Sequence, residues 1–248
     1  MYKRQGGDGA TPAALLESVS KASQDISSIH YTMTGSTPDG SFSGDVSATL
    51  KPQVAMAMKM SSPSEPGQQV EIRLVDGAMY MGAEGKWLKF DLKAADPKAA
   101  EQLNSLGKGP QGPENPGDRA NDLLRSKDVR LVGEETLDGQ KTKHLSGTVT
   151  LEQMRASAAS GDPATKESRE RSVKTLEQQG IKDMVVDLWV DGTNHTKQVR
   201  TQGKGTKGAL DVTIKLLDFN KPADVTAPPA DQVVDLADMM KDTGEGSA

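Results

Sequence analysis

The hydrophobic positions of the chain change period near residue 30. Before that point apolar residues recur every three or four positions, which predicts an amphipathic helix beginning near Thr11 and Pro12. Its apolar face contains Leu15, Val19, Ala22, Ile26 and Ile29. From Tyr31 onward apolar and polar residues alternate, and Pro38-Asp39-Gly40 supplies the turn of a β-hairpin. The chain therefore begins with a helix followed by antiparallel strands.

The same alternation predicts a β-meander of about six strands, ending in a hairpin that turns at residues 83–85. Two helical segments then flank a Gly/Pro-rich surface loop at residues 107–118. Later elements are a hairpin across Asp138-Gly139, a polar helical region from Leu151 to Gln179, three strands (183–190, 196–202 and 209–217) and a C-terminal helix from Asp231 to Lys241. Since every strand connection is a hairpin or a helical excursion, we predict an α+β fold with an antiparallel sheet.

A row of methionines stands out in the stretch KPQVAMAMKMSS, residues 51–62. Residues two apart in a strand point to the same face of the sheet, so one face of this strand is apolar while Lys59 points the other way. Other predicted strands continue this face. The candidate ligand-binding residues are Val54, Met56, Met58, Met60, Val70, Ile72, Leu74, Val186, Leu188, Leu210, Val212 and Ile214.

This apolar face has two interpretations. It can pack against the helix of residues 15–29 as ordinary core, or it can line a cavity for an acyl chain. Aromatic residues are only 3% of the chain, so aliphatic side chains and eleven methionines must fill the interior, and methionine adapts to irregular space. Each buried methylene of a guest would contribute about 0.8 kcal/mol. Both interpretations stay open, because one end of a hollow can be packed while the other holds a ligand.

Length and charge indicate one domain with few classes of partner. We expect a domain at residues 13–241, a disordered N-terminal linker at 1–12 and a disordered tail at 242–248. The net charge is −5 with both signs mixed along the chain, so we expect no nucleic-acid partner and a monomer. Cysteine is absent, and no apolar run reaches the roughly 18 residues of a membrane span.

Catalytic and metal-binding patterns are missing from the sequence. The histidines, His30, His144 and His195, fall on separate predicted elements, and neither a zinc motif nor a nucleophile elbow, P-loop or dinucleotide fingerprint occurs. We therefore expect a protein that is not an enzyme and that has neither a cofactor nor a metal site.

Four short motifs resemble a known family. They are Val75-Asp76-Gly77, Gly85-Lys86-Trp87, Leu188-Trp189-Val190-Asp191 and Asp218-Phe219-Asn220-Lys221-Pro222. In this order they are similar to motifs of the LppX/LprG-type lipoproteins of high-GC Gram-positive bacteria, which are relatives of the LolA and LolB carriers. The resemblance implies a strongly curved antiparallel sheet, a half-barrel, whose concave face is covered by helices. It also implies attachment outside the cytoplasmic membrane by a lipid anchor, and several members of the family carry acyl-chain lipids in the hollow.

Two functions follow as expectations. The first is an extracytoplasmic carrier or binding protein that holds a lipid or another hydrophobic ligand in the hollow. The second is a surface-acting modulator of a membrane sensor or envelope protein, suggested by the loop at residues 107–118 and the polar region from Leu151 to Gln179. The cysteine that bears the anchor in this family is absent from the sequence, so membrane anchoring is expected from the resemblance alone.

Overall fold

The structure, a computed structural model, describes residues 10–62, 69–83, 85–91, 116–158, 163–223 and 225–235. Within these ranges the helices are α1 (Pro12–Ser23), α4 (Pro116–Leu124), α5 (Leu151–Ala158), α6 (Pro163–Gln178) and the 3-10 turn η1 (Ala230–Gln232). The strands are β1 (Ser28–Thr37), β2 (Gly40–Thr49), β3 (Ala55–Ser61), β4 (Gln69–Val75), β5 (Ala78–Ala83), β6 (Lys86–Asp91), β7 (Arg130–Leu137), β8 (Gln140–Thr150), β9 (Asp183–Asp191), β10 (Thr196–Gly205), β11 (Gly208–Phe219) and β12 (Val233–Asp235).

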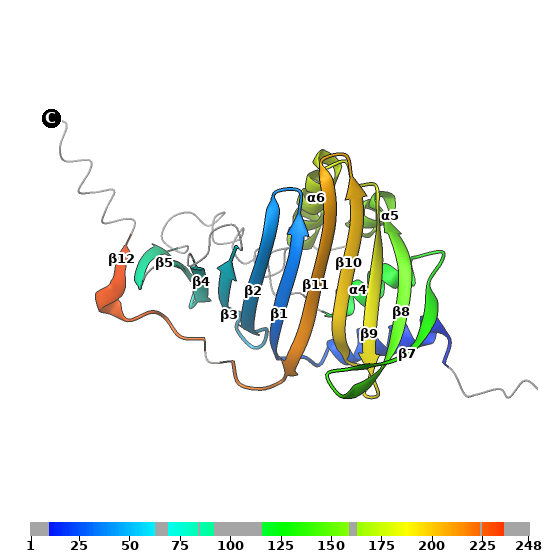
Figure 1. Cartoon of the computed structure of the whole chain (residues 1–248). Helices are drawn as coiled ribbons and strands as arrows, with labels where there is room; N and C mark the ends of the chain where they lie inside the picture. Colours follow the sequence, from blue (N-terminus) through cyan, green and yellow to red (C-terminus); the bar gives the residue numbers. More distant parts are fainter. Residues whose placement is uncertain are drawn as a thin grey trace, which may run out of the picture.

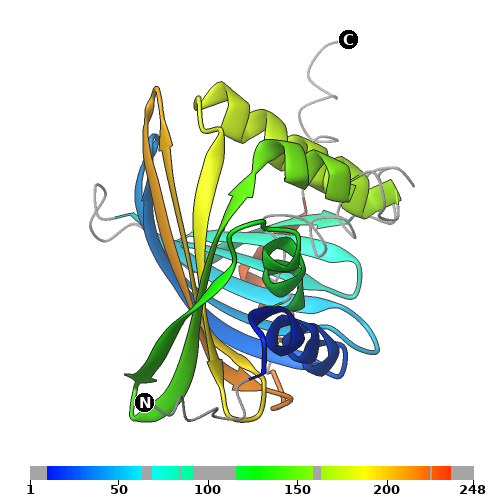
Figure 2. The same cartoon turned by 90° about the vertical axis from the view of Figure 1, so that its right-hand side faces the viewer.

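All twelve of these strands belong to one sheet in the order β12-β6-β5-β4-β3-β2-β1-β11-β10-β9-β8-β7. Neighbours are antiparallel except for β12, which pairs in parallel with β6. The first six strands form one meander and β7 to β11 form another, and the two meet where β1 pairs with β11. Figure 2 shows that the sheet is strongly curved and open, with the helices on its concave side. The predicted α+β half-barrel is confirmed.

Helix α1 is shorter than predicted. Thr11 caps it, since its hydroxyl accepts a hydrogen bond from the Ala14 N–H at 3.2 Å, and Pro12 occupies the first turn. The helix ends at Ser23, where the N–H of Gln24 turns back to carbonyls of the last turn. The prediction that it continues to Ile29 was wrong, because Ile29 already lies in β1. The helical spacing of Ile29 coincided with the alternation of the strand that follows.

The prediction of a C-terminal helix beginning at Asp231 was also wrong for the residues that the structure describes. Residues 230–232 form η1 and residues 233–235 form β12, while residues 236–241 lie outside the described ranges. In Figure 1 the chain after β11 follows one rim of the sheet to reach β12 at the far edge. There Asp235 accepts a hydrogen bond from the Lys89 ammonium at 3.2 Å. Residues 233–235 pair with the edge of β6 instead of continuing a helix.

The turns and the remaining described helices lie close to their predicted positions, while the helical segment predicted before residue 107 lies outside the described ranges. Asp76-Gly77 and Asp138-Gly139 both have positive φ values, as two-residue hairpins require. The polar region predicted from Leu151 to Gln179 is helical and divides into α5 and α6. Helix α4 begins at Pro116, so the last three residues of the predicted loop are its first turn, and residues 107–115 lie outside the described ranges.

Asp128 joins the segment after α4 to β8. Its carboxylate accepts hydrogen bonds from the Ser126 hydroxyl at 2.5 Å, the Thr148 N–H at 2.8 Å and the Thr148 hydroxyl at 2.7 Å. The Ser126 hydroxyl and the two Thr148 donors are the chief reason why the pKa of Asp128 falls from 3.8 to about 2. The ionised form is therefore the one that ties this connection to the sheet.

We predict that Asp128→Asn lowers the free energy of unfolding at pH 6 by about 1 kcal/mol, since Asp128 is exposed and solvent screens its charge. The folded pKa lies below the unfolded value, so the contribution is present above pH 3.8 and is lost as pH falls through about 2. Urea denaturation across this range should show the two proteins converging at low pH. A constant difference at every pH would contradict the assignment, and the exposed Asp25→Asn is the control.

Candidate hydrophobic ligand site

The methionine row lies on the concave face of the sheet. Cross-strand register aligns Val46 with Met58, Met58 with Ile72, and Ile72 with Met81. A parallel row runs from Met56 through Leu74 and Met79 to Phe90. On the other face of β3, Lys59 is exposed and its ammonium lies 3.5 Å from the carboxylate of Glu71. The alternation read from the sequence therefore gives one apolar and one polar face.

Two hydrophobic clusters occupy the concave side. The first joins α1 and α4 to β8, β9 and β10 and is closely packed, with Leu16, Leu123 and Leu188 fully buried. The second joins β1 to β4 with β11 and contains Met56 and Met58. Helix α1 belongs to the first cluster, so of the segment 15–29 that was predicted as one helix, only the part after α1 shares a cluster with the methionines. The buried residues before them in the chain that share their cluster are Ile26, Ile29, Tyr31, Val46 and Ala48.

The candidate residues divide between these clusters. Those in or packed against the second cluster are Val54, Met56, Met58, Met60, Ile72, Leu74, Val212 and Ile214. Val186 and Leu188 belong to the first cluster. Val70 is 42% exposed, and Leu210 is half-buried and belongs to neither cluster of the described residues. The structure thus brings most of them together, from β3, β4 and β11.

Burial along the methionine row falls steadily toward β5. Val46 is fully buried, Met58 is 9% exposed, Ile72 is half-buried and Met81 is 40% exposed. An exposed methionine on the apolar side of a sheet leaves surface that a hydrophobic partner can cover. Along this row the second cluster is therefore buried at β2 and exposed at β5, whereas Leu74 of β4 in the neighbouring row is buried.

Several residues of this face were missed as candidates. Met79, Met81, Leu88 and Phe90 continue it on β5 and β6, and their alternation in the segment 78–91 was a usable signal. Gly44 was missed as well. A Cβ added there would lie 2.6 Å from the Met60 sulfur and 2.9 Å from the Met33 Cγ, so this glycine makes room for two flexible side chains. Only the cross-strand register reveals that role.

A group of polar side chains lies on the opposite, convex face. The His144 ring nitrogens lie 2.8 Å from a Glu135 carboxylate oxygen and 2.9 Å from an Asp187 oxygen. The Trp189 indole N–H donates to Glu135 at 2.7 Å, and the His144 and Trp189 rings stack with centroids 4.2 Å apart. Hydrogen bonds from Trp189 and His144 lower the pKa of Glu135. These contacts tie β7, β8 and β9 together, and in the described part of the chain no cluster of side chains suits a metal ion.

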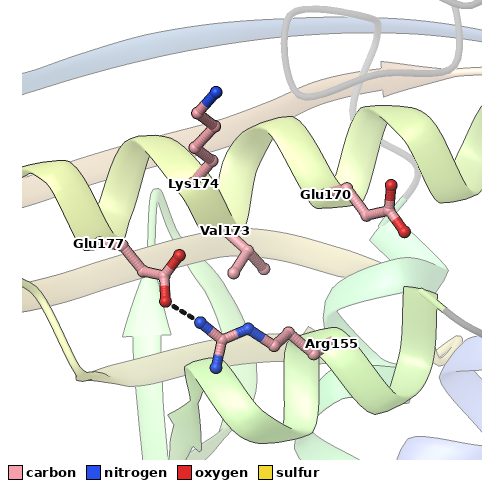
Figure 3. A pocket seen from close by; sticks show the side chains of 5 residues that line it. All are labelled: Arg155, Glu170, Val173, Lys174 and Glu177. Atoms are coloured by element: carbon pink, nitrogen blue, oxygen red, sulfur yellow. Dashed lines mark ion pairs between the residues drawn. The ribbon is translucent and has the colours of Figure 1, made fainter.

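A small hollow of about 310 Å³ lies between α5 and α6 (Figure 3). Arg155 of α5 reaches across to an ion pair with Glu177 of α6, whereas Lys174 points away from this pair. Glu170 and Val173 complete the lining. With four charged residues around one valine, this hollow does not suit an acyl chain, and none of the candidate residues lines it.

The sequence model of the LppX_LprAFG lipoprotein family matches residues 11–225. The chain belongs to the LppX_LprAFG lipoprotein family. Among solved structures, it is similar to LprF from Mycobacterium bovis, with a TM-score of 0.55 and 16% identity, covering 90% of this chain and 100% of that one. It is also similar to the Mycobacterium tuberculosis lipoprotein LppX, with a TM-score of 0.54 and 16% identity, covering 87% and 98%. At this identity the two structures show a shared fold.

A relative in Streptomyces griseus, a 31.2 kDa protein of the rplA-rplJ intergenic region, is 30% identical over 122 residues. The match covers 49% of this chain and 39% of the relative, so it spans about two fifths of that protein. Among the helices described for this LppX_LprAFG family member, none has the length and hydropathy needed to cross a membrane.

The unequal packing of the two clusters predicts unequal responses to truncation. Leu16→Ala should lower the free energy of unfolding by about 2 to 5 kcal/mol, because Leu16 is fully buried in the first cluster. Met60→Ala should cost about 1 kcal/mol or less, since Met60 is only half-buried and lies among flexible neighbours. Guanidinium denaturation measures both values. Equal losses would mean that the methionine side is as tightly packed as the helical side.

Proposed function

We propose that this protein is a non-enzymatic, extracytoplasmic carrier or binding protein for a lipid or another hydrophobic ligand. The ligand occupies the concave side of the half-barrel along β3, β4 and β5, with Met56, Met58 and Met60 as part of the wall. The observation that carries the proposal is the row from Val46 to Met81, which is sealed at one end and exposed at the other. A ligand entering from the β5 end would cover the exposed part of that row.

The chemistry of this surface fits an acyl chain better than a ligand with polar groups. Methionine side chains are unbranched and polarizable, so they adjust to guests of different shape. Each methylene taken from water contributes about 0.8 kcal/mol, which provides affinity without hydrogen-bonding partners. The polar groups of this part of the sheet, such as Lys59, Glu71 and Arg73, point to the convex face. Selection would therefore depend on size and shape.

Family membership supports the location of this activity. The matching family is one of lipoproteins, which favours a chain attached outside the cytoplasmic membrane. A binding protein at that place meets membrane lipids directly. An apolar concave face would bind lipid, and a lipid anchor would keep that face near the bilayer that supplies the lipid.

A second candidate function is modulation of a membrane sensor or envelope protein through the surface. The observation that favours it is α6, whose Lys166, Glu170 and Lys174 are exposed and whose principal packing partner is α5. Such a helix offers a charged surface to a protein partner without involving the hollow.

Native mass spectrometry with solvent extraction tests the two functions. The protein is produced in an actinobacterial host and purified without detergent. A carrier should retain an adduct of lipid mass, and Met58→Asp should abolish it, because a buried carboxylate would face the acyl chain. Ala57→Asp is the matched control: it places the same charge on the convex face of the same strand and should keep the adduct.

Met81→Asp provides a second variant whose folding is less at risk, since Met81 is already 40% exposed. It should weaken the adduct while leaving the unfolding midpoint close to that of the parent. A parent protein that carries no lipid in repeated preparations would contradict the carrier proposal. In that case charge reversal on α6 should be tested for loss of a membrane partner.

A further inference from the structure

A shallow hollow of about 500 Å³ lies on the convex face, on the opposite side of the sheet from the proposed lipid site. Register places Thr34 beside Thr213 and Thr213 beside Arg200, so two threonines form its floor between longer side chains. Its lining residues are Thr34, Gly35, Ser36, Ser41, Trp189, Gln198, Arg200, Asp211 and Thr213. The volume falls within the range of small-molecule sites.

One wall of the hollow is held by a bidentate ion pair. Arg200 donates from Nε and Nη2 to the two carboxylate oxygens of Asp211, at 2.9 Å and 2.7 Å. Gln202 adds a third hydrogen bond to the same carboxylate at 3.0 Å. Such a pair fixes both side chains in one geometry, which reduces the entropy that a ligand would have to overcome.

The opposite wall is equally constrained. Trp189 is fixed by its hydrogen bond to Glu135 and by the stacked His144 ring. Gln198 lies beside Trp189 in the register of β9 and β10. Lys215, the next neighbour of Gln198 in the sheet, pairs with Asp138 at 3.5 Å. This side therefore presents an indole, an amide and a lysine that already has a counter-ion.

The cations around the hollow already have carboxylate partners. Arg200 is paired with Asp211 and Lys215 with Asp138, while the His144 ring lies between Asp187 and Glu135. A phosphate or carboxylate ligand would have to compete with these carboxylates. The other polar groups of the lining are four hydroxyls and one amide, each of which both donates and accepts hydrogen bonds. A floor of threonines gives an acyl chain little apolar surface.

We propose that this convex hollow binds a neutral saccharide. A sugar ring presents hydroxyls that match the donor and acceptor groups of Thr34, Gln198 and Thr213, and it brings no charge that would disturb the Arg200–Asp211 pair. Because the hollow is shallow, much of the sugar stays in solvent and the affinity falls in the millimolar range. The site does not depend on the proposed lipid function, since it lies on the other face of the sheet.

Chemical-shift mapping by NMR on the 15N-labelled protein tests the site, with maltotriose, mannotriose and cellotriose as probes. At least one of these sugars should give saturable shifts at Thr34, Gln198, Arg200 and the Trp189 indole N–H. Gln198→Ala should weaken binding about fivefold to tenfold through the lost amide hydrogen bonds. Ser47→Ala, on the same face of the sheet but toward the far end of β2, is the matched control and should leave binding unchanged.

Thr213→Tyr fills the floor and should abolish the sugar-induced shifts while the backbone signals of Glu135 and Thr148, which do not line the hollow, keep their positions, which shows that the convex face is still folded. The proposal is overturned if none of the three sugars gives saturable shifts, or if Thr213→Tyr binds as the parent does. It is also overturned if inorganic phosphate or a Ser/Thr-rich peptide perturbs these residues while the sugars do not. Native mass spectrometry of Thr213→Tyr keeps the two sites separate, because any lipid adduct should persist.

Discussion

The alignment of apolar side chains across neighbouring strands is the constraint on which the rest of the structure depends. Strands such as β3 and β4 have an apolar and a polar set of alternate residues, and the register must place the apolar sets on one side. The row from Val46 through Met58 and Ile72 to Met81 shows this alignment over four strands. A slip of one residue in β3 would turn its methionines to the convex face and Lys59 to the concave face. The short Asp-Gly turns fix the register of β4 with β5 and of β7 with β8.

Curvature gives the two halves of this sheet different interiors. Near β8 to β10 the concave side is filled by α1 and α4, whose leucines pack on Leu145 and Leu188. Near β3 to β5 the strands themselves supply much of the apolar cluster, and flexible methionines take the place of rigid side chains. Close packing favours one well-defined structure, whereas methionine-rich packing tolerates change. The molecule thus combines a rigid side with an adaptable one.

Local signals in the sequence were enough to predict most of the fold. Alternation and turn residues located the hairpins, and the single-faced pattern of residues 54–60 identified the wall of the candidate site. Errors arose where two patterns coincided. Ile29 continued a helical spacing although it lies in a strand, and the segment near Asp235, predicted as helix, is an edge strand that depends on β6. Such segments are decided by backbone partners distant in the chain, which periodicity does not reveal.

Register also explains why the convex face was harder to predict than the concave one. An apolar face repeats along each strand, so one strand is enough to show it. The contacts of His144 require Glu135 and Asp187, and those of Arg200 require Asp211, each from another strand. A polar cluster therefore exists only after the strands are aligned. Because the same alignment builds both faces, the apolar cluster and the polar hollow lie on opposite sides of one sheet.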